Sequence, residues 1–155
     1  MRKLIAPRLI FSIIFSFFIF QSLYADSKWL TLKEGNKIVL IRHALAPGGG
    51  DPTGFKINDC KTQRNLNKVG IDQSKKIGEL FKRNQIPIDR VLSSQWCRCK
   101  DTAKYAFNNY ETFSALNSFY DERFAANEIK QINALKKYIK NWNGEKNIIF
   151  VTHFV

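Results

Sequence analysis

The sequence predicts an α/β fold: a three-layer α/β/α sandwich with a mostly parallel sheet. Three short apolar runs are typical of buried strands, and they begin at Lys37, Ile88 and Asn147. Longer stretches with apolar residues at helical spacing lie between these runs. Strands that alternate with helices favour a parallel sheet, because each crossover helix covers a face of that sheet. The 155 residues are enough for one such domain and too few for two.

The first run, Lys37-Ile-Val-Leu-Ile-Arg-His-Ala44, predicts a buried strand that stops at Arg42 and His43. The next segment, Ala46-Pro-Gly-Gly-Gly-Asp-Pro-Thr-Gly54, is rich in turn residues. A P-loop is excluded, because no Gly-Lys-Ser/Thr follows the glycines. We therefore expect a flexible loop at the strand tip, where functional sites are commonly built.

The second unit is a helix that begins after the N-cap residue Asn67 and ends near Asn84, followed by a strand over Ile88–Ser94. One face of this helix carries the side chains that we expect to pack on the sheet: Gly70, Ser74, Ile77, Leu80 and Phe81.

A helix from Cys97 to Phe107 comes next and places Arg98 in its first turn. Residues 108–126 are aromatic and polar without a clear period, so we expect an ordered excursion over the sheet with room for one short strand. The last helix spans residues 127–142, and its expected core face consists of Ile129, Ile132, Leu135, Ile139 and Trp142. The strand Asn147–Thr152 then leads to His153.

Residues 1–25 have the pattern of a secretory signal peptide. Basic residues precede an uncharged apolar stretch from Leu9 to Phe20, and the small residue Ala25 precedes a polar segment. The alternative is an uncleaved membrane anchor, but the stretch is shorter than the roughly 20 residues that spanning requires. We therefore expect cleavage near Ala25, a periplasmic or extracellular domain of residues 26–155, and no stable membrane span after cleavage.

The formal charge is +12, and without residues 1–25 it is +9, because Arg2, Lys3 and Arg8 are the charged side chains of that segment. This balance favours anionic partners, such as a small phosphorylated substrate or an envelope phosphate. Nucleic acid is not expected, because the domain is exported and has no Lys/Arg cluster with interleaved aromatic residues. The sequence does not indicate an oligomeric state.

Three cysteines, Cys60, Cys97 and Cys99, lie in the exported part. In an oxidising compartment we expect three cysteines to form one disulfide and leave one free thiol. Cys60 can pair with either Cys97 or Cys99. Cys97 and Cys99 are poorly placed to pair with each other. A zinc site would need a fourth ligand, so we expect no metal.

The two histidines of the chain, His43 and His153, both follow a predicted strand, so we expect them at the same sheet edge as the helix start that carries Arg98. Guanidinium forks and helix N-terminal N–H groups suit a phosphate. A neutral imidazole can attack phosphorus to form a phosphohistidine, while arginines and a second histidine, if protonated, stabilise the oxygens without a metal. The alternative is that each histidine is a structural polar group at a strand end.

Four ordered segments resemble motifs of the histidine phosphatase superfamily, also called the phosphoglycerate mutase-like family. They are Ile38-Val-Leu-Ile-Arg-His-Ala44, Asn65-Leu-Asn-Lys-Val-Gly-Ile-Asp-Gln-Ser74, Val91-Leu-Ser-Ser-Gln-Trp-Cys-Arg-Cys-Lys-Asp-Thr-Ala103 and Val151-Thr-His153. The resemblance implies a phosphoglycerate mutase-like fold and a histidine acid-type phosphatase that needs no cofactor. It implies that His43 is the nucleophile and that Arg42, Arg98 and His153 form the substrate phosphate pocket.

Some residues depart from the family pattern. A glycine often stands at the positions of Ala44 and Phe154. The family's general acid, a carboxyl in the excursion, has no clean match, and Asp121 is the candidate that we carry forward. Cysteines beside Arg98 are unusual in the family. A disulfide from one of them to Cys60 would tie the glycine-rich loop to the helix turn that carries Arg98. The alternative is that these cysteines are small buried residues at a helix start.

The sequence ends at Val155, where the family would continue into another helix and usually a closing strand. The chain is therefore either a shortened member or a fragment, and we expect the phosphatase domain of residues 26–155 to be incomplete at its C-terminus.

Together these features predict an exported hydrolase that acts on phosphomonoesters through phospho-His43. A non-catalytic phospho-ligand binding protein of the same fold is the alternative, because the general acid is not matched. A mutase is less expected, since mutases usually act on cytosolic metabolites. The sequence does not identify the substrate.

Overall fold

The computed structural model describes residues 28–153. The signal peptide expected over residues 1–25 lies outside the described residues, as do Phe154 and Val155.

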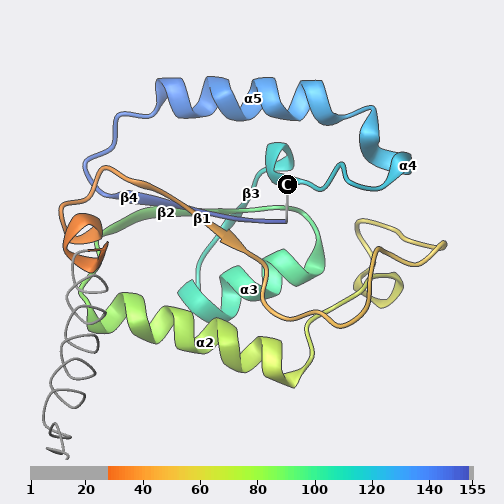
Figure 1. The fold of residues 1–155 in the computed structure, drawn as a ribbon, viewed down its shortest axis with the longest axis horizontal. Coiled ribbons are helices and arrows are strands. Elements are labelled where there is room, and N and C mark those ends of the chain that lie inside the picture. Colours follow the sequence, from red (N-terminus) through yellow and green to blue (C-terminus); the bar gives the residue numbers. More distant parts are fainter. Residues whose placement is uncertain (1–27, 154–155) are drawn as a thin grey trace, which may run out of the picture.

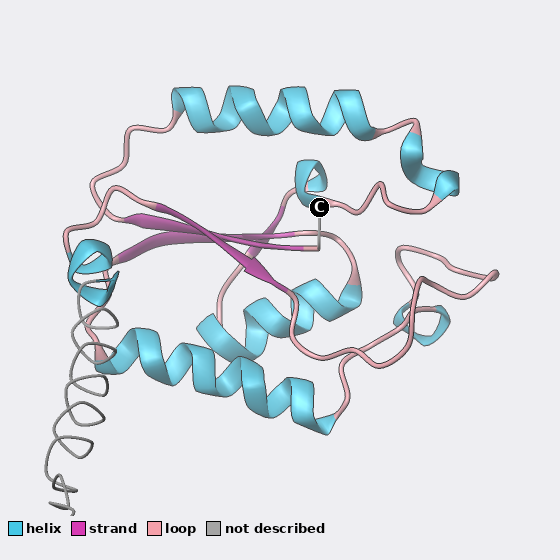
Figure 2. Ribbon diagram, in the orientation of Figure 1, coloured by secondary structure: helices cyan, strands magenta, loops and turns pink. Residues whose placement is uncertain are grey.

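Four strands form one sheet with the order β1-β4-β2-β3, and all of its pairs are parallel. The strands are β1 (Ile38–Arg42), β2 (Ile88–Ser93), β3 (Glu111–Thr112) and β4 (Asn147–Thr152). Helices α2 (Lys68–Arg83) and α3 (Cys97–Phe107) cover one face of the sheet, and α5 (Glu128–Asn141) covers the other (Figures 1 and 2). The predicted α/β/α sandwich with a parallel sheet is confirmed.

Strand β4 lies inside the sheet, and all six of its residues are buried. Successive side chains of a strand point to opposite faces. Accordingly Ile149 and Val151 belong to the core on the α2 and α3 side, whereas Ile148 and Phe150 belong to the core beneath α5. A continuous apolar run is therefore what this position requires. His153 follows directly from the most completely buried strand of the sheet.

Helix α2 begins where the sequence predicts, because the Asn67 side chain accepts a hydrogen bond from the Gly70 N–H at 2.9 Å. The helix then lies directly against α3. A Cβ added at Gly78 would collide with the backbone carbonyl of Ala106, so the two helices pack this closely only with glycine at that position. This packing fixes α3, and with it the first turn that carries Arg98.

Between β3 and α5 the chain forms two short elements, η2 (Ser114–Leu116) and α4 (Glu122–Ala125). A further 3₁₀ turn, η1 (Cys60–Thr62), lies in the long connection from β1 to α2. The excursion predicted over residues 108–126 thus contains the short strand β3.

Two details differ from the sequence-based expectations. Ile129 and Ile139 of α5 are not core residues, since their exposed fractions are 76% and 38%. The helix turns its Leu135, Tyr138 and Trp142 face to the sheet instead. In addition, residues 28–33 form a helix that the sequence did not predict.

That helical segment packs on the α2 side of the core, where Trp29 contacts Phe81 edge to face at 5.7 Å between ring centroids. Within residues 28–153, no helix has the length and apolar character needed to cross a membrane.

Candidate active site

The carboxyl ends of β1, β2 and β4 meet at one edge of the sheet. The His43 N–H donates to Thr152 O at 2.9 Å, and the Ser94 N–H donates to Val151 O at 2.9 Å, so the pairing of the strands extends to their last residues. The rings of His43 and His153 consequently lie 5.5 Å apart between centroids. The structure therefore brings both histidines of the chain together.

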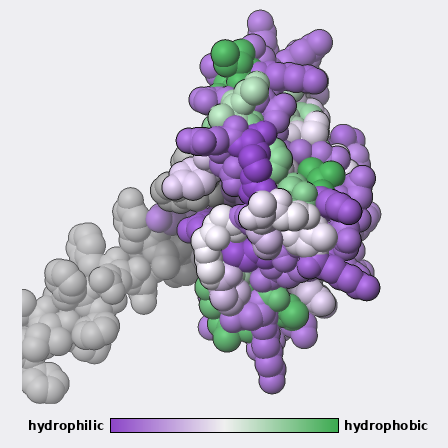
Figure 3. Space-filling view, turned by 90° about the vertical axis from the view of Figure 1, so that its right-hand side faces the viewer, coloured by the Kyte–Doolittle hydropathy of each residue, from purple (hydrophilic) through white to green (hydrophobic). Residues whose placement is uncertain are grey.

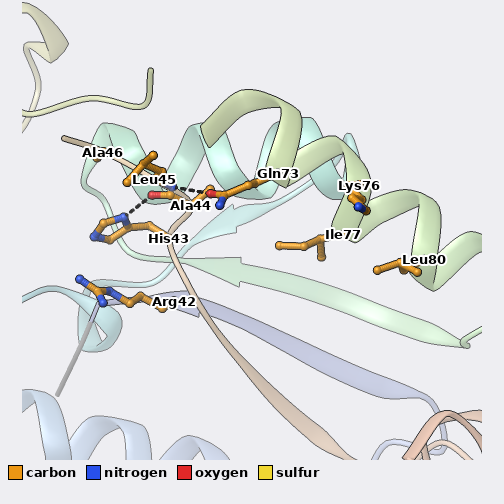
Figure 4. A pocket seen from close by; sticks show the side chains of 9 residues that line it. All are labelled: Arg42, His43, Ala44, Leu45, Ala46, Gln73, Lys76, Ile77 and Leu80. Carbon is orange, nitrogen blue, oxygen red and sulfur yellow. Dashed lines mark hydrogen bonds between the residues drawn. The ribbon is translucent and has the colours of Figure 1, made fainter. Parts of the chain in front are cut away.

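His43 is buried, and its imidazole is held by its own backbone turn. Nδ1 lies 2.8 Å from Ala44 O. Figure 4 marks this contact with a dashed line. A carbonyl oxygen only accepts, so Nδ1 carries the proton and Nε2 keeps its lone pair. Burial, with the nearby Arg98, lowers the pKa of His43 to about 4 although the bond to Ala44 opposes the shift. The side chain is therefore neutral at neutral pH, with Nε2 available as a nucleophile.

The turn after β1 is fastened by both neighbouring helices. The Ala44 N–H donates to the Thr102 hydroxyl at 2.9 Å, and this hydroxyl donates to Arg98 O at 2.8 Å. The Leu45 N–H donates to the Gln73 side chain of α2 at 2.9 Å (Figure 4). These bonds fix the position of His43 relative to the first turn of α3.

His153 lies between α3 and the loop after β2. Its Nε2 is 2.9 Å from the Ser94 hydroxyl, and its Nδ1 is 3.3 Å from Nη2 of Arg98. Burial, then the Arg98 charge, lowers the pKa of His153 to about 3. The second histidine is therefore neutral in this structure, so the positive charge of the site resides on arginines.

Arg98 is almost fully buried and pairs with a residue that the sequence did not single out. Asp51, from the glycine-rich loop, accepts from Nη1 of Arg98 at 2.6 Å and from Nη2 at 3.2 Å, and it also accepts from Nε1 of Trp96 at 2.8 Å. Burial acts to raise the pKa of Asp51, but these hydrogen bonds outweigh it and the pKa is lowered. Asp51 is therefore an ionised carboxylate that orients Arg98.

The glycine-rich loop makes specific hydrogen bonds with Arg64. Arg64 donates through Nε to Gly50 O at 2.9 Å and through Nη1 to Ala46 O. Gly48 and Gly50 have φ angles of +88° and +63°, values that residues other than glycine rarely adopt. The loop can therefore bend back and place Asp51 on Arg98.

A cavity of about 410 Å³ opens at this edge of the sheet. Its wall contains the predicted site residues, with Asp51 and Arg64 from the connection between β1 and α2. The predicted residues in the wall are Arg42, His43, Arg98, Asp121 and His153. Figure 3 shows the side of the molecule that carries the loops after the strands, where hydrophilic surface predominates and apolar side chains form separate small patches.

A second cavity of about 540 Å³ lies beside α2 and is drawn in Figure 4. Arg42 and His43 line it too, but Arg98 and His153 do not. In the figure, the guanidinium of Arg42 and the imidazole of His43 extend to the same side, away from Lys76 and Leu80. The arginine and imidazole groups of all three strand ends therefore converge on the 410 Å³ cavity and not on this one.

Asp121, the predicted general acid, reaches the cavity wall but is engaged elsewhere. Its carboxylate pairs with Arg123 at 2.7 Å between Oδ2 and Nη2. The hydrogen bonds from Arg123 lower the pKa of Asp121 to about 2. In this arrangement Asp121 is ionised and holds no proton for a leaving group.

The cysteines form one disulfide, between Cys60 and Cys97, and leave Cys99 as a buried free thiol. The disulfide joins η1 to the residue that precedes Arg98. Burial raises the pKa of Cys99 to about 12, so this thiol is neutral. Among the described residues there is no group of three His, Cys, Asp or Glu side chains arranged to hold a metal ion.

The family model of the histidine phosphatase superfamily, branch 1, matches residues 38–116, about half of the chain. The chain belongs to this superfamily. The matched part contains His43, Arg98 and the connection between them, whereas His153 lies beyond it. A comparison with curated proteins finds no significant match.

Solved structures share the fold of this histidine phosphatase domain. The protein histidine phosphatase SixA, complexed with tungstate, is 19% identical with a TM-score of 0.51, and the alignment covers 76% of this chain and 69% of SixA. Rv3214 of Mycobacterium tuberculosis is 16% identical, with a TM-score of 0.54 and coverage of 76% and 74%. The mycobacterial glucosyl-3-phosphoglycerate phosphatase Rv2419c is 15% identical, with a TM-score of 0.51 and coverage of 75% of each chain. These likenesses establish the fold.

Several residues of this candidate site were not found from the sequence. Asp51 and Arg64 lie in irregular chain, where no periodicity indicates which side chains turn inward. Ser94 was predicted only as the last residue of the strand over Ile88–Ser94. Asn117, which contacts Ser94, lies in the excursion whose path the sequence does not define.

Proposed function

We propose that the chain hydrolyses phosphomonoesters through a covalent phosphohistidine on Nε2 of His43, without a metal ion. The observation that carries this proposal is the 2.8 Å bond from Nδ1 of His43 to Ala44 O, which leaves the lone pair on Nε2. The lowered pKa of His43, about 4, keeps that lone pair free of a proton at neutral pH. Membership of the histidine phosphatase superfamily supports the same chemistry.

In the first step Nε2 of His43 attacks phosphorus, the N–P bond forms, and the P–O bond to the leaving group breaks. The leaving oxygen takes the electron pair and acquires a proton from solvent. In the second step a water molecule attacks phosphorus and releases a proton to solvent. The N–P bond breaks, its electron pair returns to Nε2 of His43, and inorganic phosphate leaves. Arg42 and Arg98 line the same cavity as His43, and their charges stabilise the equatorial oxygens in both steps.

The test is to trap the intermediate. Brief incubation with a ³²P-labelled phosphomonoester should label the wild-type chain through a bond that is stable to base and labile to acid. His43→Asn should abolish the label and reduce turnover by on the order of 10³-fold or more, as loss of a covalent nucleophile does. Lys76→Gln is the matched control, because Lys76 lines only the neighbouring 540 Å³ cavity. Undiminished labelling of His43→Asn would refute the proposal.

The second candidate function is phospho-ligand binding without efficient turnover. It is favoured by the state of the two cavity carboxylates, Asp51 and Asp121, since both have lowered pKa values and neither holds a proton. General acid catalysis contributes about 10²–10⁴-fold in rate. A hydrolase that lacks it should depend steeply on the leaving group.

A series of aryl and alkyl phosphates separates the two candidates. A hydrolase without a general acid should turn over the aryl esters with acidic leaving groups and lose rate progressively as the leaving-group pKa rises. A binding protein should bind inorganic phosphate and turn over none of the series. Phosphohistidine and glucosyl-3-phosphoglycerate belong in the panel, because the names of two structural neighbours refer to these substrates.

We also propose that the domain acts outside the cytoplasm on a small phosphorylated substrate or an envelope phosphate. The support is the basic and apolar pattern of residues 1–25 and the disulfide between Cys60 and Cys97, which is typical of oxidising compartments.

A further inference from the structure

A continuous series of polar contacts passes through His153 and connects the glycine-rich loop to the excursion after β3. Asp51 pairs with Arg98 at 2.6 Å, and Nη2 of Arg98 lies 3.3 Å from Nδ1 of His153. On the other side of the ring, Nε2 lies 2.9 Å from the Ser94 hydroxyl, which is 3.2 Å from Oδ1 of Asn117. All the donors and acceptors of this series can be assigned.

The assignment begins at Asn117. The backbone N–H of Gln95, which can only donate, lies 2.8 Å from Oδ1 of Asn117, and the amide group of Asn117 donates to the Gln95 side chain at 2.8 Å. Oδ1 is therefore an acceptor, and the Ser94 hydroxyl beside it must be the donor of their contact. With its proton directed to Asn117, the Ser94 oxygen can only accept from His153. Nε2 of His153 must therefore carry a proton.

The contact with Arg98 leads independently to the same protonation of His153. A guanidinium has no acceptor, so the contact between Arg98 and Nδ1 of His153 requires a lone pair on Nδ1. A neutral imidazole carries one proton, which again places it on Nε2. The lowered pKa of His153, about 3, agrees with a neutral ring.

Cys99 fits this arrangement too. Its thiol lies 3.5 Å from Thr152 O, to which it donates, and its sulfur faces Nε2 of His153 at 3.4 Å as a weak acceptor.

We propose that Ser94, oriented by Asn117, is a positioning residue that fixes His153 as the Nε2–H tautomer, so that the Nδ1 lone pair faces Arg98 and holds its guanidinium in the cavity. In the other tautomer an N–H of His153 would face an N–H of Arg98, and the two donors would repel each other. The role of Ser94 in binding a phosphoryl group rests on the proposed function, whereas the tautomer does not.

The two histidines of the site thus differ in tautomer. His43 carries its proton on Nδ1 because a backbone carbonyl accepts it, and His153 carries its proton on Nε2 because a side chain accepts it. A backbone acceptor cannot be removed by substitution, but the Ser94 hydroxyl can. Ser94 is therefore the point at which the arrangement can be tested.

The test is a long-range ¹H–¹⁵N NMR spectrum of the full chain labelled at histidine nitrogens, without ligand and at neutral pH. Only two rings contribute, and a His43→Asn sample assigns them. The wild-type spectrum should show His153 with a protonated Nε2 and an unprotonated Nδ1. Ser94→Ala should give a mixture in which Nδ1–H is populated. A wild-type ring protonated on Nδ1 alone or on both nitrogens would overturn the proposal, whether or not Ser94→Ala folds.

Ser93→Ala is the matched control. Ser93 is as fully buried as Ser94, but its hydroxyl donates to the Ser94 carbonyl and makes no hydrogen bond to His153. Ser93→Ala should leave the tautomer of His153 unchanged, and Ser94→Thr, which keeps a hydroxyl, should restore it. An equal effect of Ser93→Ala and Ser94→Ala would overturn the proposal, because the cause would then be general packing.

A binding readout connects the tautomer to the site. By calorimetry with inorganic phosphate, Ser94→Ala should bind roughly tenfold more weakly than wild type, the effect of one lost hydrogen bond, and Ser93→Ala should not change. Unchanged phosphate affinity in a Ser94→Ala chain whose tautomer has shifted would overturn the role of Ser94 in holding Arg98. Absence of phosphate binding in every chain, with the expected wild-type tautomer, would instead refute the proposed function and leave the tautomer assignment in place.

Discussion

Replacing Asp51 with alanine should destabilise the domain strongly, because it leaves the Arg98 guanidinium buried without a counter-charge. The side chains of Arg98 and Asp51 are 4% and 7% exposed. Removing one partner from a buried ion pair costs about 3–5 kcal/mol. The indole N–H of Trp96, now bonded to Asp51 at 2.8 Å, loses its acceptor as well. Because whole domains are stable by only about 5–15 kcal/mol, a loss of this size is readily measured.

Urea unfolding followed by tryptophan fluorescence gives the comparison. Asp51→Ala should lower the unfolding free energy by about 3–5 kcal/mol. Asp121→Ala is the matched control, because it removes an equal charge from the same cavity wall. The Asp121–Arg123 pair is substantially exposed, with side-chain exposures of 32% and 39%, so losing it has little effect. The variant also removes the N-cap bond of α4 to the Arg123 N–H, and a smaller loss than for Asp51→Ala is therefore expected. Equal midpoints for the two variants would show that the contact between Asp51 and Arg98 does not stabilise the fold.

The pH dependence provides an independent check of the same pair. The pKa of Asp51 is lower in the folded chain than in the unfolded one, where an aspartate titrates near about 3.9. The pair therefore stabilises the fold fully above that unfolded value, and its contribution is lost as the pH falls through the folded pKa. The difference between wild type and Asp51→Ala should accordingly be constant near neutral pH and shrink below about pH 4. A difference that grows on acidification would contradict the assignment.

Three further predictions follow from the site and its surroundings. The pKa of His43 is lowered to about 4, so kcat/KM for an aryl phosphate, corrected for substrate ionisation, should stay level down to about pH 5. It should fall below about pH 4, where the imidazole gains a proton. A decline centred near the ordinary histidine pKa would contradict a buried neutral His43. Cys60→Ser opens a disulfide that spans 37 residues of sequence and should cost up to about 4 kcal/mol in urea unfolding, whereas dithiothreitol should not destabilise Cys60→Ser further because Cys99 is unbonded. When the full chain is secreted, N-terminal sequencing should find Asp26 as the first residue, and retention of residues 1–25 would refute signal cleavage.

The position of the site was predictable because it depends on topology. Parallel strands share a carboxyl edge, so the runs that precede His43 and His153 had to end at the same edge of a parallel sheet. That the two strands are neighbours comes from the pairing of β1 with β4 in the structure. Arg98 could be placed as well, since it falls in the first turn of a helix whose start the sequence indicates.

The interior of the site was not predictable in the same way. Asp51 reaches Arg98 only because the loop folds back, and that path depends on Arg64 and Arg123, which donate to loop carbonyls far along the sequence. No local pattern encodes such contacts. The predicted core face of α5 was wrong at Ile129 and Ile139 for a related reason. An amphipathic helix can rotate about its axis by a residue or two. Contacts such as that of Tyr138 with Phe150, 6.0 Å between ring centroids, decide which of its side chains face the sheet.

The source of positive charge in the cavity limits how the site can act. Sequence reasoning allowed a protonated second histidine to stabilise the phosphoryl oxygens, but His153 is neutral, so the arginines carry the positive charge of the cavity. Both terminal nitrogens of Arg98, Nη1 and Nη2, already donate to Asp51, and Nη2 also contacts His153. An incoming phosphoryl group must therefore share the guanidinium with these partners or displace one of them. Displacement of Arg98 from His153 would free Nδ1, the one nitrogen of that ring able to accept a proton. Phosphate binding should then be accompanied by proton uptake on His153. Calorimetry in buffers of different ionisation enthalpy would detect this uptake. Binding without proton exchange would mean that Arg98 keeps its contact with His153 while it holds the phosphate.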